Sequence, residues 1–424
     1  MSPTHSRGRD AHDPSKTEAI GGHPVKPRFV PVFVLILVLA FPCAPTASQG
    51  ATPAPTAGTE RNSTAILVTS AGTPMRVTGS DGQDHIEYDL LVTNAFVAPV
   101  TLTSVEVLDE SGEILLALEG DALAAVTQSI FAPQPVTSIP IDGSVAIVID
   151  VIVPPERTVD RVTHRIVHEM APDAPARAVL ETFQVDGPVL DVSPQPAIVI
   201  SPPMRGAGWL SANGCCLPTV HRSVRISDGT TITKAETFTI DWIRWQDGKV
   251  FRGDGTGNDD WYAYGADMLA VADGIVVSTR NDMPDETPFQ APEHLNEPGD
   301  FAGNHVIIEI EPGVYAFYAH LAPGSVTVSV GDSVETGDVV GKLGNSGSTS
   351  GPHLHFGLLD YPDPLVGNSL PLVFDAYTIQ GTIDGELIER MDGGPTGGDI
   401  PLSGDPQPQT ETHQLVYTVA DFGE

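Results

Sequence analysis

The chain has 424 residues, which corresponds to two or three domains of ordinary size. Its 21 Lys and Arg side chains against 55 Asp and Glu side chains give a formal net charge of -34, which repels phosphate backbones and excludes nucleic acid as an expected partner. The 42 Gly and 38 Pro residues predict many turns and therefore a mainly β protein. The three cysteines, Cys43, Cys215 and Cys216, cannot form a disulfide framework or a Cys-based zinc site, so any metal needs His and carboxylate ligands.

The amino terminus has the pattern of an export signal. Basic residues between Arg7 and Arg28 precede an apolar run from Phe29 to Phe41. This run is shorter than the roughly 20 residues needed to span a bilayer, and small residues follow it, as at a signal-peptidase site. We therefore predict a signal peptide over residues 1–47, a secreted or cell-envelope protein, and no stable membrane insertion after cleavage. An uncleaved anchor is the alternative interpretation.

The rest of the chain divides into four predicted parts. Residues 48–61 form a Thr-, Pro- and Ala-rich linker, and residues 62–198 contain short Val-, Ile- and Thr-rich runs separated by turn residues. These runs, which predict an immunoglobulin-like β-sandwich, are 88–93, 100–108, 114–118 and 145–153. After a Pro-rich hinge, residues 199–395 form a second domain, and the Gly- and Pro-rich residues 396–424 predict a flexible tail.

One His pair in the predicted sandwich invites a metal interpretation. His164 and His168 are four residues apart and would share a face of a helix, but the second His of a zinc helix motif is missing. The neighbouring Val162, Ile166 and Val167 fit a strand equally well. We therefore interpret both histidines as structural.

The strongest chemical signal is the segment Gly351-Pro352-His353-Leu354-His355-Phe356-Gly357. In a strand, His353 and His355 project from the same face about 6 to 7 Å apart, while Leu354 and Phe356 enter the core. The spacing thus directs two imidazoles at one point.

Two further candidates lie upstream of this segment. His320 ends an apolar run in which alternation places Val314, Ala316, Tyr318 and His320 on one face. Asp241 lies in an otherwise apolar segment, where an unpaired carboxylate would be costly, so it should be paired or bind a metal. His221 precedes it by nineteen intervening residues.

These segments together resemble the lysostaphin-like zinc metallopeptidases. The resemblance covers about 140 to 160 residues, and the ordered set of segments is far more specific than any one of them. The matching segments are His221 to Asp241, Gly265 to Val277, Gly303 to Ile308, Tyr318 to Leu321, Gly331 to Gly341 and Gly351 to Phe356. The resemblance implies an antiparallel β barrel-sandwich-hybrid domain after the sandwich.

The same resemblance implies the roles of the site residues. His221, Asp241 and His355 would be the ligands of a Zn²⁺ ion, a set that leaves a fourth position open for water. His353 is the candidate general base and His320 would orient the water or stabilise the oxyanion, although the two roles can be exchanged.

The function implied is a secreted zinc metalloendopeptidase that hydrolyses peptide bonds in bacterial cell-wall peptidoglycan by zinc-activated water. Two alternatives compete with it. One is a non-catalytic relative that binds peptidoglycan or activates another hydrolase. The other is a biotinyl or lipoyl carrier domain, suggested by the turn at residues 330–338, but Lys342 lies beyond the position that a carrier lysine needs.

The sequence departs from the family pattern at one position. The family usually places three residues between its first His and Asp, whereas here Arg222 to Ile240 intervene. We predict that this insertion loops out between paired strands, with a turn at Asp228-Gly229. His221 is therefore the least secure ligand, and the alternatives are His294, His305 or a ligand from outside this domain.

Overall fold

The computed structural model describes residues 62–130, 132–391 and 399–424. The predicted signal peptide (1–47) and linker (48–61) lie outside the described residues. Residues Glu60–Glu424 form one compact unit. No helix within the described ranges has the length and apolar character needed to cross a membrane.

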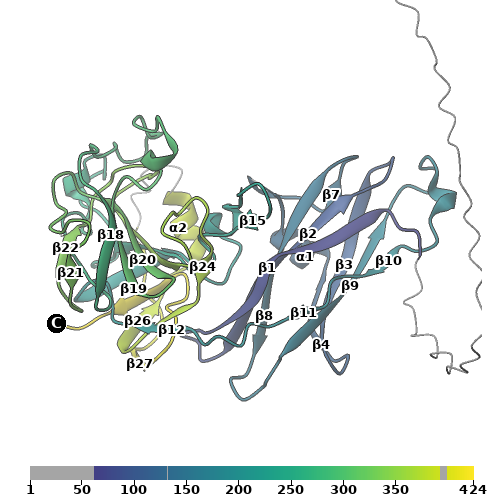
Figure 1. Cartoon of the computed structure of the whole chain (residues 1–424), viewed down its shortest axis with the longest axis horizontal. Helices are drawn as coiled ribbons and strands as arrows, with labels where there is room; N and C mark the ends of the chain where they lie inside the picture. The colour runs from purple at the N-terminus through teal and green to yellow at the C-terminus, as the bar shows by residue number, and fades with distance from the viewer. Residues whose placement is uncertain (1–61, 131, 392–398) are drawn as a thin grey trace, which may run out of the picture. The chain divides into compact units, whose positions relative to one another are not determined.

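Two antiparallel sheets make up the N-terminal region (Figure 1). The first has the order β1 (Ile66–Thr78), β2 (Asp84–Asn94), β8 (Ser144–Val153), β5 (Thr127–Ser129) and β6 (Ala132–Pro135). The second has the order β10 (Gln184–Asp186), β9 (Arg161–Glu169), β3 (Val100–Asp109) and β4 (Ile114–Glu119), with β11 (Leu190–Asp191) on β9 and β7 (Ser138–Ile139) on β3. A short helix α1 (Gly120–Val126) and a 3₁₀ turn η1 (Arg177–Val179) connect strands.

The two sheets bury one shared apolar core. Alternate residues of β2, including Ile86 and Leu90, pack with Val105 of β3 and Ile166 of β9, as expected for strands that bury one face. The predicted strand runs and the mainly β class are confirmed, while the immunoglobulin-like topology stays a prediction. His164 and His168 lie on strand β9, and Nε2 of His164 is 2.7 Å from the Tyr88 hydroxyl, in agreement with a structural role.

An eleven-stranded sheet organises the second region, drawn mainly in green to yellow in Figure 1. Its order is β21 (Ser333–Val334), β18 (Gly274–Arg280), β19 (Asn304–Glu311), β20 (Val314–Leu321), β23 (Leu354–Leu359), β16 (Ile240–Arg244), β13 (Ala207–Asn213), β28 (Thr418–Asp421), β26 (Tyr377–Thr382) and β27 (Gln407–Gln409), with β24 (Ser369–Leu370) on β23. No pairing among the described strands closes this sheet into a barrel.

Smaller elements complete the second region. The pairs are β12 (Ile198–Ile200) with β25 (Leu372–Phe374), β14 (Ile226–Ser227) with β15 (Ile232–Thr233), and β17 (Asp267–Leu269) with β22 (Val339–Lys342). The short helical elements are η2 (Val220–Ser223), η3 (Asn258–Asp260), η4 (Pro298–Asp300) and α2 (Gly385–Met391). Fully buried Trp242, Tyr318 and Phe356 lie in the main core, where each buried side chain of this size contributes on the order of 1.5–3 kcal/mol.

The prediction of a flexible tail over residues 396–424 is wrong for the last part of this range. Strand β28 pairs with both β13 and β26, so it lies inside the central sheet. Val419 and Ala420 have no exposed surface, and the Gln414 side chain accepts a hydrogen bond from Trp242 Nε1 at 2.8 Å. Burial of these apolar groups orders a segment whose Gly and Pro content suggested disorder.

Candidate metal centre

Three neighbouring strands place the first site residues side by side. Asp241 of β16 is in register with His355 of β23, and His355 is in register with Ala319 of β20. The residues that flank Asp241 and His355 along their strands all point into the main core: Ile240, Trp242, Leu354 and Phe356. Because side chains alternate along a strand, Asp241 and His355 share the opposite face.

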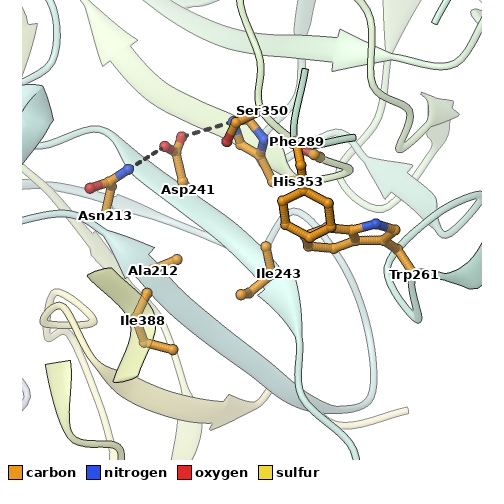
Figure 2. A pocket seen from close by; sticks show the side chains of 10 residues that line it. Ala212, Asn213, Asp241, Ile243, Trp261, Phe289, Ser350, His353 and Ile388 are labelled. Carbon is orange, nitrogen blue, oxygen red and sulfur yellow. Dashed lines mark hydrogen bonds and ion pairs between the residues drawn. The ribbon is translucent and has the colours of Figure 1, made fainter. Parts of the chain in front are cut away.

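The buried Asp241 carboxylate has the partners that the sequence analysis required. Oδ1 is 2.9 Å from Nδ1 of His355. Oδ2 accepts a hydrogen bond from Asn213 Nδ2 at 2.9 Å, which Figure 2 shows. Burial alone would raise the pKa of Asp241, but the imidazoles of His221, His353 and His355 hold it well below its usual range. The carboxylate is therefore ionised at neutral pH.

His221 reaches this carboxylate from a 3₁₀ turn. Its Nε2 lies 2.9 Å from Oδ2 of Asp241, and its ring centroid is 5.1 Å from that of His355. Its Nδ1 is 3.0 Å from the Thr239 carbonyl oxygen, so a proton on Nδ1 can be donated there while Nε2 faces the site. The expectation that His221 lies on a strand beside Asp241 is wrong, since η2 carries it, yet the predicted convergence on His355 is present.

The insertion between His221 and Asp241 is only partly a loop. Asp228 and Gly229 form the predicted turn between β14 and β15, and Gly229 has a left-handed φ of 93°. The segments on both sides of this hairpin are buried and include Arg225 and Lys234. The insertion is thus packed into the fold at both ends.

His353 precedes β23 and converges on the same point, as predicted. Its Nδ1 lies 2.8 Å from the Gly351 carbonyl oxygen, and its Nε2 lies 3.5 Å from Oδ1 of Asp241. Burial alone would lower the pKa of His353, but the Asp241 carboxylate raises it above the ordinary value.

His320 faces His353 and His355 because its backbone breaks the strand alternation. Its ring centroid lies 4.7 Å from that of His353 and 5.5 Å from that of His355. Its φ is 62°, in the left-handed region that costs a non-glycine residue energy. The prediction that His320 shares the face of Tyr318 is therefore wrong: Tyr318 and Leu321 both enter the main core, whereas His320 turns to the site.

A glycine-rich loop holds His320 in this conformation. His320 Nδ1 lies 2.8 Å from the Ser346 carbonyl oxygen, and the Gly344 amide donates to the His320 carbonyl oxygen at 3.0 Å. A Cβ on Gly344 would lie 2.3 Å from the backbone nitrogen of Ala322. Only glycine allows this close approach. Burial and the neighbouring His353 and His355 lower the pKa of His320 well below its ordinary value.

Two site residues were missed by the sequence analysis. Asn213 holds Asp241 from β13, and no motif marks it. Glu236, which is 4% exposed, places its carboxylate oxygens 3.9 Å from Nε2 of His221 and 3.9 Å from Nε2 of His355. Burial raises the pKa of Glu236, and the two imidazoles oppose that rise. The expected cost of a buried carboxylate was the one signal that could have identified it.

The alternative ligands lie elsewhere. His294 Nδ1 is 2.9 Å from Glu286 Oε1, and His305 Nε2 is 3.0 Å from Ser278 Oγ. Neither belongs to the groups of closely spaced ligand atoms around Asp241 and His355.

A groove opens beside the imidazoles. Its walls include Val220, Phe289, Pro292 and Phe301 together with the site residues described above. A pocket that shares Asp241 and His353 with the groove extends it between apolar side chains (Figure 2), namely Ala212, Ile243, Trp261, Phe289 and Ile388. The groove thus combines polar groups at the imidazoles with apolar surface next to them.

The donor set fits a zinc ion. The ligand atoms of His221, Asp241 and His355 all lie within 4.8 Å of one another, and so do those of His320, His353 and His355. Two imidazoles and one carboxylate form a donor set found in catalytic zinc sites, and three imidazoles form another. His355 belongs to both sets, so it is the ligand that either arrangement requires.

Comparison with known proteins finds matches for a segment of the second region. Residues 255–365 match Peptidase family M23. The chain is 31% identical over 103 residues to the peptidoglycan DD-endopeptidase ShyA of Vibrio cholerae, a match that covers 24% of this chain and 20% of that protein. It is 27% identical over 92 residues to an uncharacterized metalloprotease of Buchnera aphidicola, covering 22% of this chain and 19% of that protein. The chain thus spans about a fifth of the length of these curated relatives.

Among solved structures, the catalytic domain of the antimicrobial peptidase lysostaphin from Staphylococcus simulans is similar to the chain. The identity is 17%, the match covers 40% of this chain and 88% of that domain, and the TM-score is 0.21.

A segment of the second region therefore matches peptidase family M23, in agreement with the predicted resemblance to the lysostaphin-like metallopeptidases. The matched residues include His320, His353 and His355, whereas His221 and Asp241 precede the matched segment.

Proposed function

We propose that the chain is a zinc metalloendopeptidase that hydrolyses peptide bonds in bacterial cell-wall peptidoglycan, outside the cytoplasm, as a secreted or cell-envelope protein. The convergence of His221, Asp241 and His355 beside His320 and His353 is the observation that carries this proposal. A peptidoglycan endopeptidase among the relatives supports the substrate class.

His221 Nε2, the Asp241 carboxylate and His355 Nδ1 would hold the ion. When bound, zinc supplies Lewis acidity, which makes water nucleophilic near neutral pH. Asn213 holds one oxygen of Asp241, and the Thr239 carbonyl orients His221. Such partners outside the ligand set fix the orientation of metal ligands.

His320 and His353 would move the protons. Each ring has Nδ1 at a backbone carbonyl, so each presents Nε2 to the groove. His353 lies beside the Asp241 carboxylate, whose charge favours a protonated ring that can donate to the developing oxyanion. His320, whose pKa is lowered, is the better proton acceptor for the attacking water and can return that proton to the leaving amine. This assignment exchanges the two roles favoured by the sequence analysis.

The test is release of muropeptides from purified peptidoglycan by the full chain, with zinc present and after its removal by a chelator. We expect cleavage that zinc restores, and a loss of turnover of about 10²- to 10⁴-fold in His320→Asn and His353→Gln with zinc content unchanged. The matched variant His294→Asn, in a histidine paired with Glu286, should keep full turnover. Binding of peptidoglycan without cleavage by the zinc-loaded chain would contradict the proposal and support the non-catalytic alternative.

A further inference from the structure

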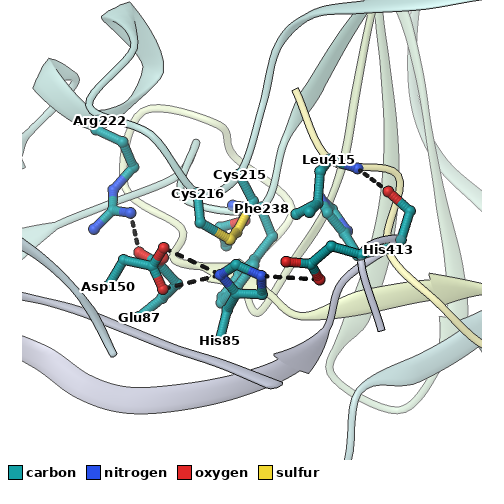
Figure 3. The surroundings of a disulfide bond; sticks show 12 residues. His85, Glu87, Asp150, Cys215, Cys216, Arg222, Phe238, His413 and Leu415 are labelled. Carbon is teal, nitrogen blue, oxygen red and sulfur yellow. Dashed lines mark hydrogen bonds and ion pairs between the residues drawn. A yellow bond between two sulfur atoms is a disulfide. The ribbon is translucent and has the colours of Figure 1, made fainter. Parts of the chain in front are cut away.

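The insertion that follows His221 is joined to strand β2 of the N-terminal sandwich by buried charges. The guanidinium of Arg222 contacts the Glu87 carboxylate and lies 2.9 Å from Oδ1 of Asp89 (Figure 3 shows the Glu87 contact). The exposed fraction of these three side chains is at most 1%. Both carboxylates belong to β2, and Arg222 directly follows His221.

Two more cations of the insertion reach the same strand. Arg225 Nε donates to Asp89 Oδ2 at 2.8 Å, with both side chains fully buried, and Lys234 Nζ lies 3.9 Å from Asp89 Oδ1. Two carboxylates of one strand therefore hold three cations on both sides of the 226–233 hairpin. Removal of one member of a buried pair leaves an uncompensated charge, so this arrangement resists displacement of the insertion.

The same short turn couples this network to the metal centre. His221 and Arg222 are consecutive residues of η2, and both are buried. Successive side chains of a 3₁₀ helix point about 120° apart, so the turn can direct Arg222 to β2 and His221 to Asp241 at once. No strand pairing fixes His221, unlike Asp241 and His355, which have register partners. The charges on β2 hold the residue next to His221 in this turn.

We infer that Glu87 and Asp89 are positioning residues for the zinc ligand His221, so that the N-terminal sandwich completes the metal centre of the peptidase domain. This inference rests on the proposed function, because it takes His221 as a ligand. It assigns the sandwich a role in metal binding besides any role in substrate binding.

The experiment compares Asp89→Asn with Asp84→Asn in the full chain. Both change one buried aspartate of β2 to its isosteric amide and remove an arginine ion pair, since Asp84 pairs with Arg76 at 3.1 Å. Zinc affinity is measured by competition with a chromogenic chelator, and the coordination is followed by the visible absorption of the Co²⁺-substituted protein. Circular dichroism checks the fold.

We expect Asp89→Asn to weaken zinc binding by about 10- to 100-fold and to shift the Co²⁺ spectrum toward that of His221→Ala. Asp84→Asn should leave the zinc affinity and the Co²⁺ spectrum unchanged. Arg222→Lys keeps the charge and should retain more affinity than Arg222→Met. If Asp89→Asn does not fold, the comparison of zinc affinity between Arg222→Lys and Arg222→Met tests the positioning role.

Two outcomes separate the failure of this inference from the failure of the proposed function. If the parent chain binds zinc and His221→Ala loses it, while folded Asp89→Asn and Arg222→Met bind like the parent, the positioning role is overturned and the proposed site stands. If the parent chain binds no zinc, both are overturned. Neither readout depends on peptidoglycan cleavage.

Discussion

His355 is common to both groups of closely spaced ligand atoms at the metal centre, so single substitutions can identify the actual ligand set. We expect His355→Ala to abolish stoichiometric zinc binding. Asp241→Asn should weaken it strongly, and His320→Asn should retain it, because asparagine tolerates the left-handed backbone at this position. Metal analysis of the dialysed proteins provides the measurement.

The opposite pattern, with zinc lost in His320→Asn and kept in Asp241→Asn, would assign the ion to the three histidines. Circular dichroism of each variant serves as the control for folding.

Zinc binding should also depend on pH through His221. Burial alone would lower the pKa of His221, but Asp241 raises it to about 9. Below that pH the ring carries a proton that a metal must displace. The apparent zinc affinity should therefore rise by about tenfold per pH unit from pH 6.5 to about 9 and then level off. Chelator competition across this pH range tests the slope. An apparent zinc affinity that does not change with pH in the parent chain would contradict this prediction.

At the scale of elements, β2 and β8 are linked by a charged histidine. His85 Nδ1 lies 3.0 Å from Asp150, and Nε2 lies 3.4 Å from Asp81 (Figure 3 includes His85 and Asp150). Burial alone would lower the pKa of His85, but these carboxylates raise it from 6.5 to about 9.

A raised histidine pKa stabilises the fold fully below the unfolded pKa, and this contribution is lost as the pH rises through the folded pKa. We expect His85 to contribute a fall in the free energy of unfolding of on the order of 2–3 kcal/mol between pH 6.5 and 9.5, as measured by urea unfolding of the full chain. His85→Gln should lose this contribution, while the contribution of His221, whose pKa is also raised to about 9, remains.

A substitution of His168 is the matched control, because burial lowers the pKa of His168 to about 4. Its titration therefore lies below the pH range of this experiment. An unchanged pH slope in His85→Gln would show that the dependence arises elsewhere.

At the scale of the whole molecule, the C-terminal segment joins the central sheet to the N-terminal region. The His413 carbonyl oxygen accepts a hydrogen bond from the Ser80 amide at 2.9 Å, and the Gln409 side chain donates to the Ser80 carbonyl at 3.2 Å. The same segment supplies β27 and β28 to the central sheet.

Removal of residues 407–424 should therefore destroy the cooperative fold, because it exposes the edges of β13 and β26 and removes the Gln414 partner of Trp242. Near-ultraviolet circular dichroism and thermal unfolding give the measurement. The exposed Asp405, which lies just before this segment, provides a control, since Asp405→Ser should unfold like the parent. A truncated chain that unfolds at the parent's temperature would contradict this prediction.

The sequence was informative wherever a local pattern determines structure. Period-two alternation around His353 and His355 correctly predicted two imidazoles on one face, and the cost of a buried carboxylate correctly predicted a partner for Asp241. Runs of β-branched residues predicted the long strands of the sandwich. These features depend on residues close together in the chain.

Local patterns gave wrong predictions where contacts between residues distant in the chain determine the structure. His320 leaves its expected face because the loop around Ser346 holds a left-handed backbone, and the Gly- and Pro-rich end of the chain is ordered by burial of Val419 and Ala420. The position of His221 on a 3₁₀ turn and the presence of Glu236 depend on how the insertion packs.

By itself, the sequence determined a mainly β protein that resembles the lysostaphin-like metallopeptidases, with His353, His355 and Asp241 in a shared site. Strand alternation and the cost of burying charge made this possible because both operate over a few residues. Only the tertiary structure decided that His221 is brought to this site by a turn whose neighbour Arg222 is bound to Glu87 and Asp89, more than a hundred residues away in the chain. The physical reason is that a buried ion pair forms wherever folding brings its two members together out of water. No local sequence pattern indicates which two residues will pair.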